Sequence, residues 1–239
     1  MEKKKTGKIY MLPCPISEGN PYDTLPEANR AVMASLDYFI VENVRTARRF
    51  LSAAKIGVAI DTLEFAECSE HTTPEDVEPL LAPILAGRNC GIISEAGLPG
   101  IADPGADVVA AAQRKGIEVV PLVGPSSIFM ALMASGQNGQ SFAFNGYLPI
   151  KPAERTRALR HFERRAITEH QSQIFIEAPY RNAKLLAEMV QTLLPTTLLT
   201  VAADITAEGE YIRTLSVGEW RKTPAPDIQK RPTIFIIGN

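Results

Sequence analysis

The amino-acid sequence predicts an α/β protein of two domains, each with its own sheet. In the first half of the chain, short apolar segments alternate with segments of helical spacing, which is typical of a parallel sheet with helices on both faces. After Val123 the pattern changes, and the final strand-like segments follow one another without helical crossovers, which favours antiparallel pairing. We expect an N-terminal, mostly parallel α/β domain over residues 1–123 and a C-terminal mixed α/β domain over residues 124–239.

In the N-terminal domain, apolar runs predict strands and the 3.6-residue spacing of apolar positions predicts helices. Pro13 and Pro15 break the end of the first strand into a loop. The expected strands are Lys8–Ile16, Tyr38–Glu42, Val58–Ala66, Cys90–Ile93 and Ile117–Val123, and the expected helices are Leu25–Leu36, Val44–Lys55, Thr73–Gly87 and Ala106–Gln113.

The C-terminal domain begins with a helix rich in Met and Ala, FMALMASG, whose methionines we assign to core packing. The expected strands are Ser141–Leu148, Gln173–Ala178, Leu198–Ala203, Tyr211–Val217 and Thr233–Ile237, and two further helices are expected at Pro152–Ile167 and Pro179–Leu194.

The composition, with 45% apolar and 22% charged residues, is ordinary for a globular protein. A net charge of −2 excludes a global attraction to nucleic acid but leaves room for a local basic patch. Cys14, Cys68 and Cys90 are odd in number and scattered, which indicates cytosolic cysteine usage and no disulfide framework. Cys68 and His71 form one isolated pair, whereas structural zinc needs four ligands, so we expect no metal site.

The charged start, MEKKKTGK, is not followed by an apolar run of signal-peptide length, and no segment approaches the length of a membrane span. These features predict a cytoplasmic protein.

The stretch Asn89–Gln113 combines a buried strand, a glycine-rich loop and a helix. Asp103 is expected at the helix N-cap and Pro104 at the first helical position. In an open α/β sheet, such a loop at the carboxyl end of a strand is where ligands bind. The simplest interpretation of Glu95 and Asp103 is still a solvated carboxylate and a helix cap. The loop is neither a GxGxxG motif nor a P-loop, so no dinucleotide or nucleoside triphosphate site is indicated.

Three loops stand out at the ends of predicted strands: Ser94–Asp103, Gly124–Ser127 and Glu177–Arg181. The loop after the first strand is a fourth. Taken singly, their serines and prolines are helix-start signals. If the strands are parallel there, the loops converge on one cleft between the domains, with room for a flat heterocycle that has a polar tail.

The helix from Pro152 is rich in arginine. One interpretation is a solvated helix face, and the alternative is a patch that contacts phosphates. Its basic residues are Arg155, Arg157, Arg160, Arg164 and Arg165, with Lys151 just before it and only Glu154 and Glu163 opposing them.

Four motifs occur in order along the chain: SEAGLPGIADPG, VVPLVGPSS, FNGYLP and FIEAPYR. Through them the sequence resembles the ribosomal RNA small subunit methyltransferase I family, within the S-adenosylmethionine-dependent tetrapyrrole methylase superfamily. The resemblance extends from Ile9 to about Glu210 and is strongest between Gly91 and Leu148.

The resemblance implies a tetrapyrrole methylase-like fold of two α/β domains, with S-adenosylmethionine in the cleft between them, and commonly a homodimer. An acceptor hydroxyl would benefit from a base, for which Glu42, Glu95 and Asp103 are the carboxylate candidates. By position, the implied cofactor contacts are Pro13, Pro15, Glu95, Ala96, Gly97, Ile101, Ala102, Asp103, Ser126, Ser127 and Ala178.

The departures from the family motifs fall on the expected site more than on the scaffold. The usual A-T-P-I-G-N is PCPISEGN at Pro13–Asn20, with an insertion, and E-D-x-R is ENVR at Glu42–Arg45. S-D-A-G-T-P becomes SEAGLP at Ser94–Pro99, and R-E-L-T-K reads AADIT at Ala202–Thr206. The histidine of E-S-P-H-R is Tyr180. These changes suggest a diverged paralogue with a shifted substrate.

The sequence therefore predicts an S-adenosylmethionine-dependent methyltransferase that acts on RNA, with 2′-O-methylation of a ribosomal RNA cytidine as the specific hypothesis. The expected partner is RNA or the small ribosomal subunit, and the arginine-rich helix motivates that expectation. Two alternatives remain open at this point. One is methylation of a tetrapyrrole or another small-molecule acceptor, and the other is a non-catalytic relic that keeps the fold and the cofactor.

Overall fold

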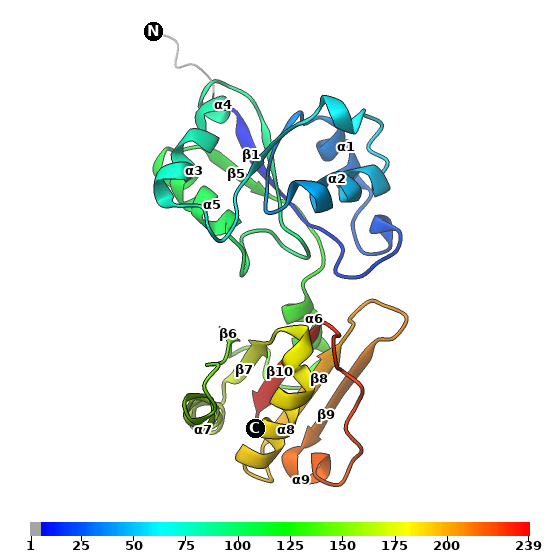
Figure 1. Ribbon diagram of the computed structural model, residues 1–239, viewed down its shortest axis with the longest axis vertical. Coiled ribbons are helices and arrows are strands. Elements are labelled where there is room, and N and C mark those ends of the chain that lie inside the picture. The colour runs from blue at the N-terminus through cyan, green and yellow to red at the C-terminus, as the bar shows by residue number, and fades with distance from the viewer. Residues whose placement is uncertain (1–5) are drawn as a thin grey trace. The chain divides into compact units, whose positions relative to one another are not determined.

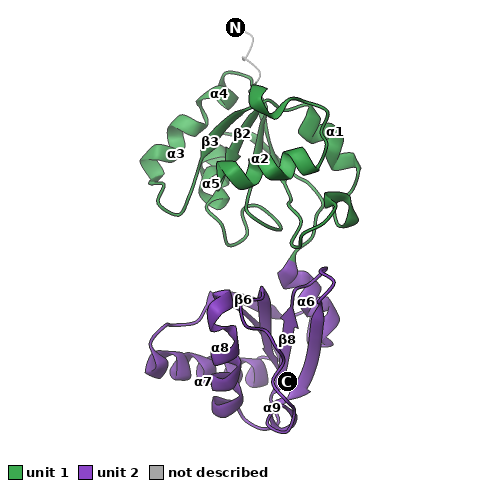
Figure 2. Cartoon of the chain, turned by 45° about the vertical axis from the view of Figure 1, so that its right-hand side comes forward, with its two compact units in different colours: residues 1–126 green, residues 127–239 purple. Residues whose placement is uncertain are grey.

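A computed structural model describes residues 6–239 of the chain (Figure 1). It contains two compact units, one ending at Ser126 and the other extending from Ser127 to Asn239 (Figure 2). The predicted charged tail lies largely outside the described residues. None of the helices within residues 6–239 is long and apolar enough to cross a membrane.

The first unit contains a sheet of five parallel strands in the order β3-β2-β4-β1-β5. Five helices connect the strands in chain order (Figure 1). The strands are β1 (Lys8–Leu12), β2 (Tyr38–Val41), β3 (Glu64–Glu67), β4 (Cys90–Ile93) and β5 (Glu118–Pro121), and the helices are α1 (Ala28–Ala34), α2 (Val44–Ala53), α3 (Pro74–Leu80), α4 (Ala82–Leu85) and α5 (Gly105–Arg114).

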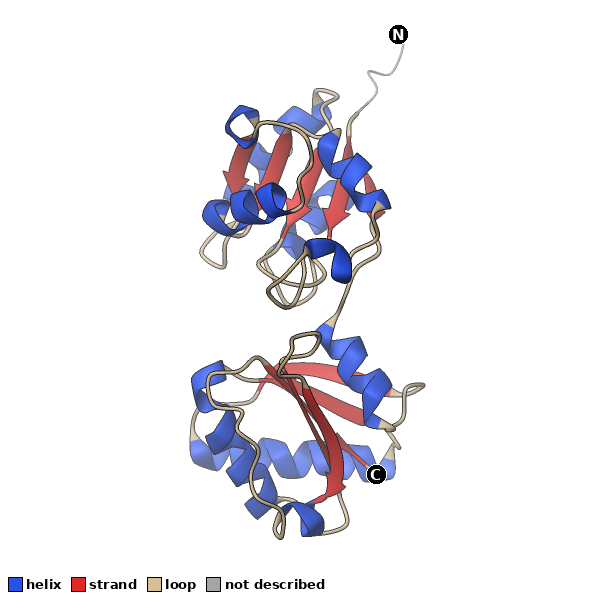
Figure 3. Cartoon of the chain, turned by 90° about the vertical axis from the view of Figure 1, so that its right-hand side faces the viewer, coloured by secondary structure: helices blue, strands red, loops and turns tan. Residues whose placement is uncertain are grey.

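Helices cover both faces of this sheet, so its central strands are apolar on both sides (Figure 3). In β2, Tyr38 and Ile40 pack with α3, α4 and α5, whereas Phe39 and Val41 pack with α1 and α2. Gly91 in β4 makes room for this packing, because a Cβ there would lie 2.8 Å from the ring of Phe39. The two apolar clusters hold the carboxyl ends of the strands in fixed positions.

The second unit has a mixed sheet in the order β6-β7-β10-β8-β9. Only β6 and β7 pair in parallel, and the last three strands of the chain pair antiparallel, as predicted. The strands are β6 (Phe142–Tyr147), β7 (Ser172–Ile176), β8 (Leu198–Ala203), β9 (Tyr211–Ser216) and β10 (Thr233–Gly238), and the helices are α6 (Ser127–Ser135), α7 (Pro152–Thr168), α8 (Asn182–Thr192) and α9 (Val217–Trp220).

Helices α7, α8 and α9 cover one face of the mixed sheet around Phe175 and Phe235, which are fully buried. Helix α6 packs against β9 and β10. The turn after it is fixed by Gln137, whose amide donates to the Thr200 hydroxyl at 2.7 Å. The sheet therefore carries α7, with its many arginines, on the outside of the unit.

Two predicted elements of the first unit differ from the structure in kind as well as in extent. The strand expected at Val58–Ala66 begins only at Glu64, because Ile60–Thr62 form a 3-10 helix. The helix expected at Thr73–Gly87 is two helices, since α3 ends before Leu81 and Pro83 lies in the first turn of α4, where no N–H is needed.

Candidate functional site

The candidate site lies at the ends of two neighbouring strands whose following helices pack on opposite faces of the sheet. Strands β1 and β4 are paired, but the chain passes from β1 to α1 on one face and from β4 to α5 on the other. In a parallel sheet, such a switch opens a crevice at the carboxyl ends of the strands. The loops that follow β1 and β4 therefore frame the site.

Three loops meet at this crevice. The Cys14 N–H donates to the Gly97 carbonyl at 2.8 Å, and the Gly97 N–H donates to the Cys14 carbonyl at 3.1 Å. The third loop approaches at Gly124, where a Cβ would lie only 2.1 Å from the Cβ of Pro13. Segments far apart in the sequence are thus packed so closely that one of them must carry glycine.

The close approach at Gly124 predicts the effect of adding one methyl group. Gly124→Ala should lower the free energy of unfolding by about 1–3 kcal/mol, because overpacking forces Pro13 or the backbone to move. Thermal unfolding of the purified protein measures this change. Gly139→Ala is the matched control, since a Cβ at Gly139 meets nothing within 4 Å. Equal unfolding midpoints for the two variants would contradict the observed packing of the loops.

Asp103 shapes the loop between β4 and α5. One carboxylate oxygen accepts the Gly100 N–H at 2.7 Å, and the other accepts the Gly105 N–H at 2.7 Å. Between these contacts, Ala102 adopts a left-handed conformation with φ of 61°. The helix begins at Gly105 with Pro104 in the N-cap position, so the predicted cap is one residue too early, although the Asp103 carboxylate still accepts a helix N–H.

The loop presents backbone groups as well as carboxylates. Ala96 and Ala102 are exposed, and within the described part of the chain their amide N–H groups donate to no protein acceptor. Their methyl side chains leave the backbone accessible to a ligand. Exposed amides beside acidic side chains suit S-adenosylmethionine, which combines a carboxylate tail with a cationic sulfonium, so the residues present fit the implied cofactor.

Glu42 is a partly buried carboxylate beside the loop after β4. It follows β2, and its side chain accepts the Glu95 N–H at 3.1 Å. Burial raises the pKa of Glu42, and the nearby carboxylates of Asp103, Glu95 and Glu70 raise it further, against the lowering effect of that hydrogen bond. A carboxylate with a raised pKa is a better proton acceptor near neutral pH, which suits Glu42 to act as a base, whereas both carboxylate oxygens of Asp103 already accept backbone N–H groups.

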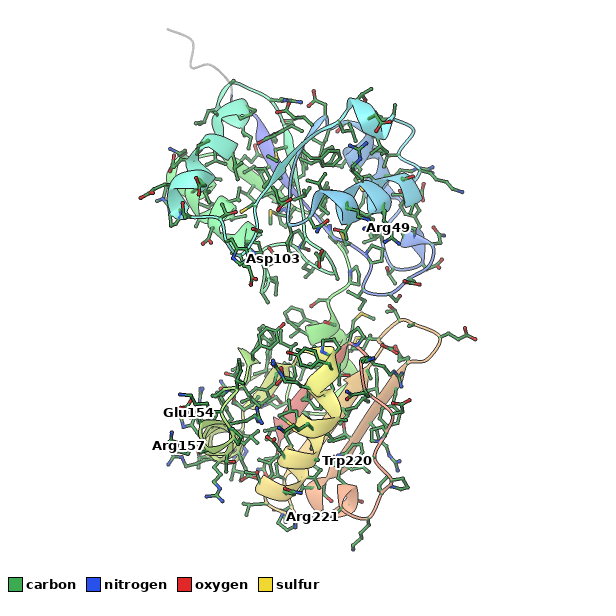
Figure 4. All side chains as sticks on the ribbon, viewed as in Figure 1. Arg49, Asp103, Glu154, Arg157, Trp220 and Arg221 are labelled. Carbon is green, nitrogen blue, oxygen red and sulfur yellow. The ribbon has the colours of Figure 1, made fainter. Side chains whose placement is uncertain are left out.

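A pocket of about 420 Å³ lies between the loop after β1 and helix α2. Arg49 and Phe50 contribute a guanidinium group and a ring to it, and Figure 4 labels Arg49 on α2 and Asp103 in the loop before α5. Sequence reasoning assigned these two α2 residues no role. Only their position in the sequence could have indicated a role, because α2 begins just after Glu42 and is capped by Asn43. The pocket is lined by Cys14, Pro15, Ser17, Glu18, Gly19, Pro21, Thr46, Arg49, Phe50, Ala53, Ser94 and Glu95.

Cys14 lines this pocket but is not a nucleophile at neutral pH. Burial raises the pKa of its thiol to about 12, and the charge of Asp103 adds to this effect. The protonated thiol donates to the Ser94 carbonyl at 3.3 Å. Cys14 therefore ties the loop after β1 to the loop after β4.

The first unit contains most of the predicted cofactor residues, in the three loops just described. Ser127 begins α6 and Ala178 precedes the short helix Pro179–Arg181, so both belong to the second unit. Their part in the site stays a prediction. Within residues 6–239, no group of three or more His, Cys, Asp or Glu side chains could hold a metal ion. The first-unit members are Pro13, Pro15, Glu95, Ala96, Gly97, Ile101, Ala102, Asp103 and Ser126.

The basic residues of α7 divide into structural and exposed groups. Including Arg155 in a phosphate patch is wrong, because its side chain is only 5% exposed. Its guanidinium forms an ion pair with Glu188 and donates to the Ile150 carbonyl at 3.0 Å. Arg165 pairs with Glu169 at 3.1 Å. Arg155 is therefore unavailable to a ligand, and Arg165 is already paired.

Three other arginines of α7, at positions 157, 160 and 164, are exposed and have no ion-pair partner among the described residues. Their spacing of three and four residues places them along one side of the helix. Figure 4 shows Arg157 pointing away from the rest of the unit. Together they form the α7 arginine stripe (Arg157, Arg160 and Arg164).

No family model matches the chain. Curated relatives do: "Ribosomal RNA small subunit methyltransferase I" of Escherichia coli O157:H7 is 32% identical over 213 residues, which cover 89% of this chain and 70% of the relative. The protein of the same name from Synechocystis sp. is 32% identical over 217 residues, which cover 91% of this chain and 71% of the relative.

Solved structures of methyltransferases share the fold. The crystal structure of the methyltransferase CobJ has a TM-score of 0.64 at 18% identity and covers 98% of this chain and 95% of its own. Uroporphyrin-III C-methyl transferase from Thermus thermophilus, complexed with S-adenosyl homocysteine, has a TM-score of 0.55 at 16% identity, with 98% of both chains covered. The predicted tetrapyrrole methylase-like fold class is confirmed.

Proposed function

Because the chain belongs to the ribosomal RNA small subunit methyltransferase I family, we propose that it methylates RNA of the small ribosomal subunit. Membership confirms the predicted enzyme class, a methyltransferase that uses S-adenosylmethionine. The finer part of the proposal is that the acceptor is the 2′-hydroxyl of a cytidine. The observation that carries the methyl-transfer proposal is the meeting of three loops at the carboxyl edge of the parallel sheet, beside Glu42.

S-adenosylmethionine supplies a methyl group activated by its sulfonium. The residues of the chain then have three tasks. Asp103 keeps the loop after β4 in shape, so that the amides of Ala96 and Ala102 stay exposed to the cofactor. Glu42, whose pKa is raised by burial, accepts the proton of the acceptor hydroxyl. Much of the remaining rate enhancement comes from holding acceptor and methyl group in line.

The remaining features implied by the family belong to the same proposal. Ser127 and Ala178 complete the cofactor contacts from the second unit, the enzyme is a homodimer, and it works in the cytoplasm. The α7 arginine stripe supports RNA as the acceptor, because three exposed cations on one helix face attract phosphates.

Transfer of a radiolabelled methyl group tests this function. Purified protein and labelled S-adenosylmethionine are incubated with undermethylated small ribosomal subunits, with large subunits, and with a free tetrapyrrole. We expect label in small-subunit RNA alone, recovered as 2′-O-methylcytidine after nuclease digestion. Label in the tetrapyrrole would support the small-molecule alternative, and no transfer to any acceptor would leave the non-catalytic relic.

A further inference from the structure

The loop after β7 carries an exposed tyrosine, and an arginine side chain contacts one face of its ring. Tyr180 lies in the short helix Pro179–Arg181 and is 62% exposed. The Arg181 guanidinium lies over its ring, 5.1 Å from the centroid, and donates to the phenol oxygen at 3.0 Å. One face of the ring thus contacts the guanidinium, and the exposed fraction leaves the other face open to a ligand.

Arg181 is itself fixed from below by a buried carboxylate. Its Nε donates to the Glu177 Oε1 at 2.9 Å, and the same oxygen accepts the Ala178 N–H at 2.7 Å. The Glu177 side chain is only 2% exposed. Tyr180 therefore sits on a rigid support, and a planar group that stacks on it pays little ordering entropy.

A second aromatic ring lies near Arg181, and two lysines lie close to Tyr180, one through the backbone of the neighbouring residue and one four residues later in the chain. Tyr147, at the end of β6, is 63% exposed and near enough to Arg181 to interact with it electrostatically. The Lys230 N–H donates to the Pro179 carbonyl at 2.9 Å. Lys184 and Lys230 are exposed and have no ion-pair partner among residues 6–239.

The charges decide between two planar ligands that could stack here, the adenine of the cofactor and a base of RNA. S-adenosylmethionine carries no phosphate and only one carboxylate beside its cationic sulfonium, so it can pair with at most one of the two exposed lysines. A polynucleotide brings a phosphate with every base. The surroundings of Tyr180 therefore favour RNA.

We propose that Tyr147 and Tyr180 form a stacking platform for unpaired bases of the RNA acceptor, whose phosphates contact Lys184 and Lys230. The inference rests on the proposed RNA function and adds to it that the bases bound beside the acceptor are single-stranded. Aromatic side chains stack on bases only where the bases are unpaired.

Tyr180→Ala and Tyr180→Phe test the platform as a matched pair. The probe is a fluorescein-labelled single-stranded oligocytidylate of about ten nucleotides, within the site size of single-strand binding proteins. We expect roughly ten-fold weaker binding by Tyr180→Ala, near wild-type binding by Tyr180→Phe, and the same slope of log Kd against log salt in both. The fold should survive, because the Gln229 contact is to the Tyr180 carbonyl.

Calorimetric titration of the same variants with S-adenosylmethionine separates the two planar ligands. Unchanged cofactor affinity in Tyr180→Ala, together with its weaker oligonucleotide binding, supports the platform. Loss of cofactor affinity instead would assign the ring to adenine and overturn the inference. Equal oligonucleotide binding by wild type and Tyr180→Ala would also overturn it, whereas a wild type that binds neither oligonucleotide nor small subunits would contradict the RNA function itself.

Discussion

Asp103→Ala should bind S-adenosylmethionine about 100-fold more weakly than the wild type. The substitution removes both acceptors that hold the loop after β4, the oxygens bonded to the Gly100 and Gly105 amides. Two lost hydrogen bonds to a charged group are worth about 3 kcal/mol, which corresponds to a factor of about 100 in affinity. Isothermal titration calorimetry measures the effect directly.

Two further variants separate the structural role of Asp103 from a role as base. Asp103→Asn keeps one carbonyl acceptor and should bind the cofactor with intermediate affinity. Asp107→Ala removes an exposed carboxylate from the same helix region and should bind like the wild type. If Asp103→Ala bound the cofactor normally but lost methyl transfer, Asp103 would be the base, and the role given to Glu42 would be wrong.

Replacing the α7 arginine stripe, Arg157, Arg160 and Arg164, with glutamine should weaken RNA binding roughly 100-fold at about 0.1 M salt. Each cation that neutralises a phosphate of a single strand contributes about 0.7 to the slope of log affinity against log salt. Removing three should therefore lower that slope by about 2. The measurement is the binding of labelled small-subunit RNA over a range of salt concentrations.

The matched control removes three exposed cations elsewhere, through Arg114→Gln, Arg213→Gln and Lys222→Gln. It has the same net charge as the stripe variant and should keep most of the affinity and the salt slope. Equal losses of RNA affinity in both variants would show that the stripe acts only through the net charge of the protein. Arg155 must stay unchanged in either variant, because its pair with Glu188 joins α7 to α8.

The sequence predicted the two sheets because their strands are runs of apolar residues, which can be recognised in a single sequence. It failed at Val58–Leu63, where Val58, Ile60 and Leu63 pack against the core from a segment that contains the 3-10 helix Ile60–Thr62. A short apolar run looks the same in a strand and in such a turn, because both bury the same side chains. Only the tertiary contacts distinguish them.

The sequence predicted the loop residues of the site but not the side chains that pack against those loops. The glycines and Asp103 were visible in the sequence, as was Glu42. The pocket beside α2 was not, because Arg49 and Phe50 line it only when that helix lies against the loop after β1. Arg155 was misassigned for the same reason, since its partner Glu188 is 33 residues away in the chain.

Cofactor titration tests most directly whether the three converging loops form the methyltransferase site. The wild type and two loop-blocking variants, Gly97→Trp and Ser126→Trp, are titrated by calorimetry with S-adenosylmethionine and with its demethylated product. We expect saturable binding by the wild type and none by either variant. Full binding by folded Gly97→Trp, or none by the folded wild type, would contradict the assignment of these loops to the cofactor.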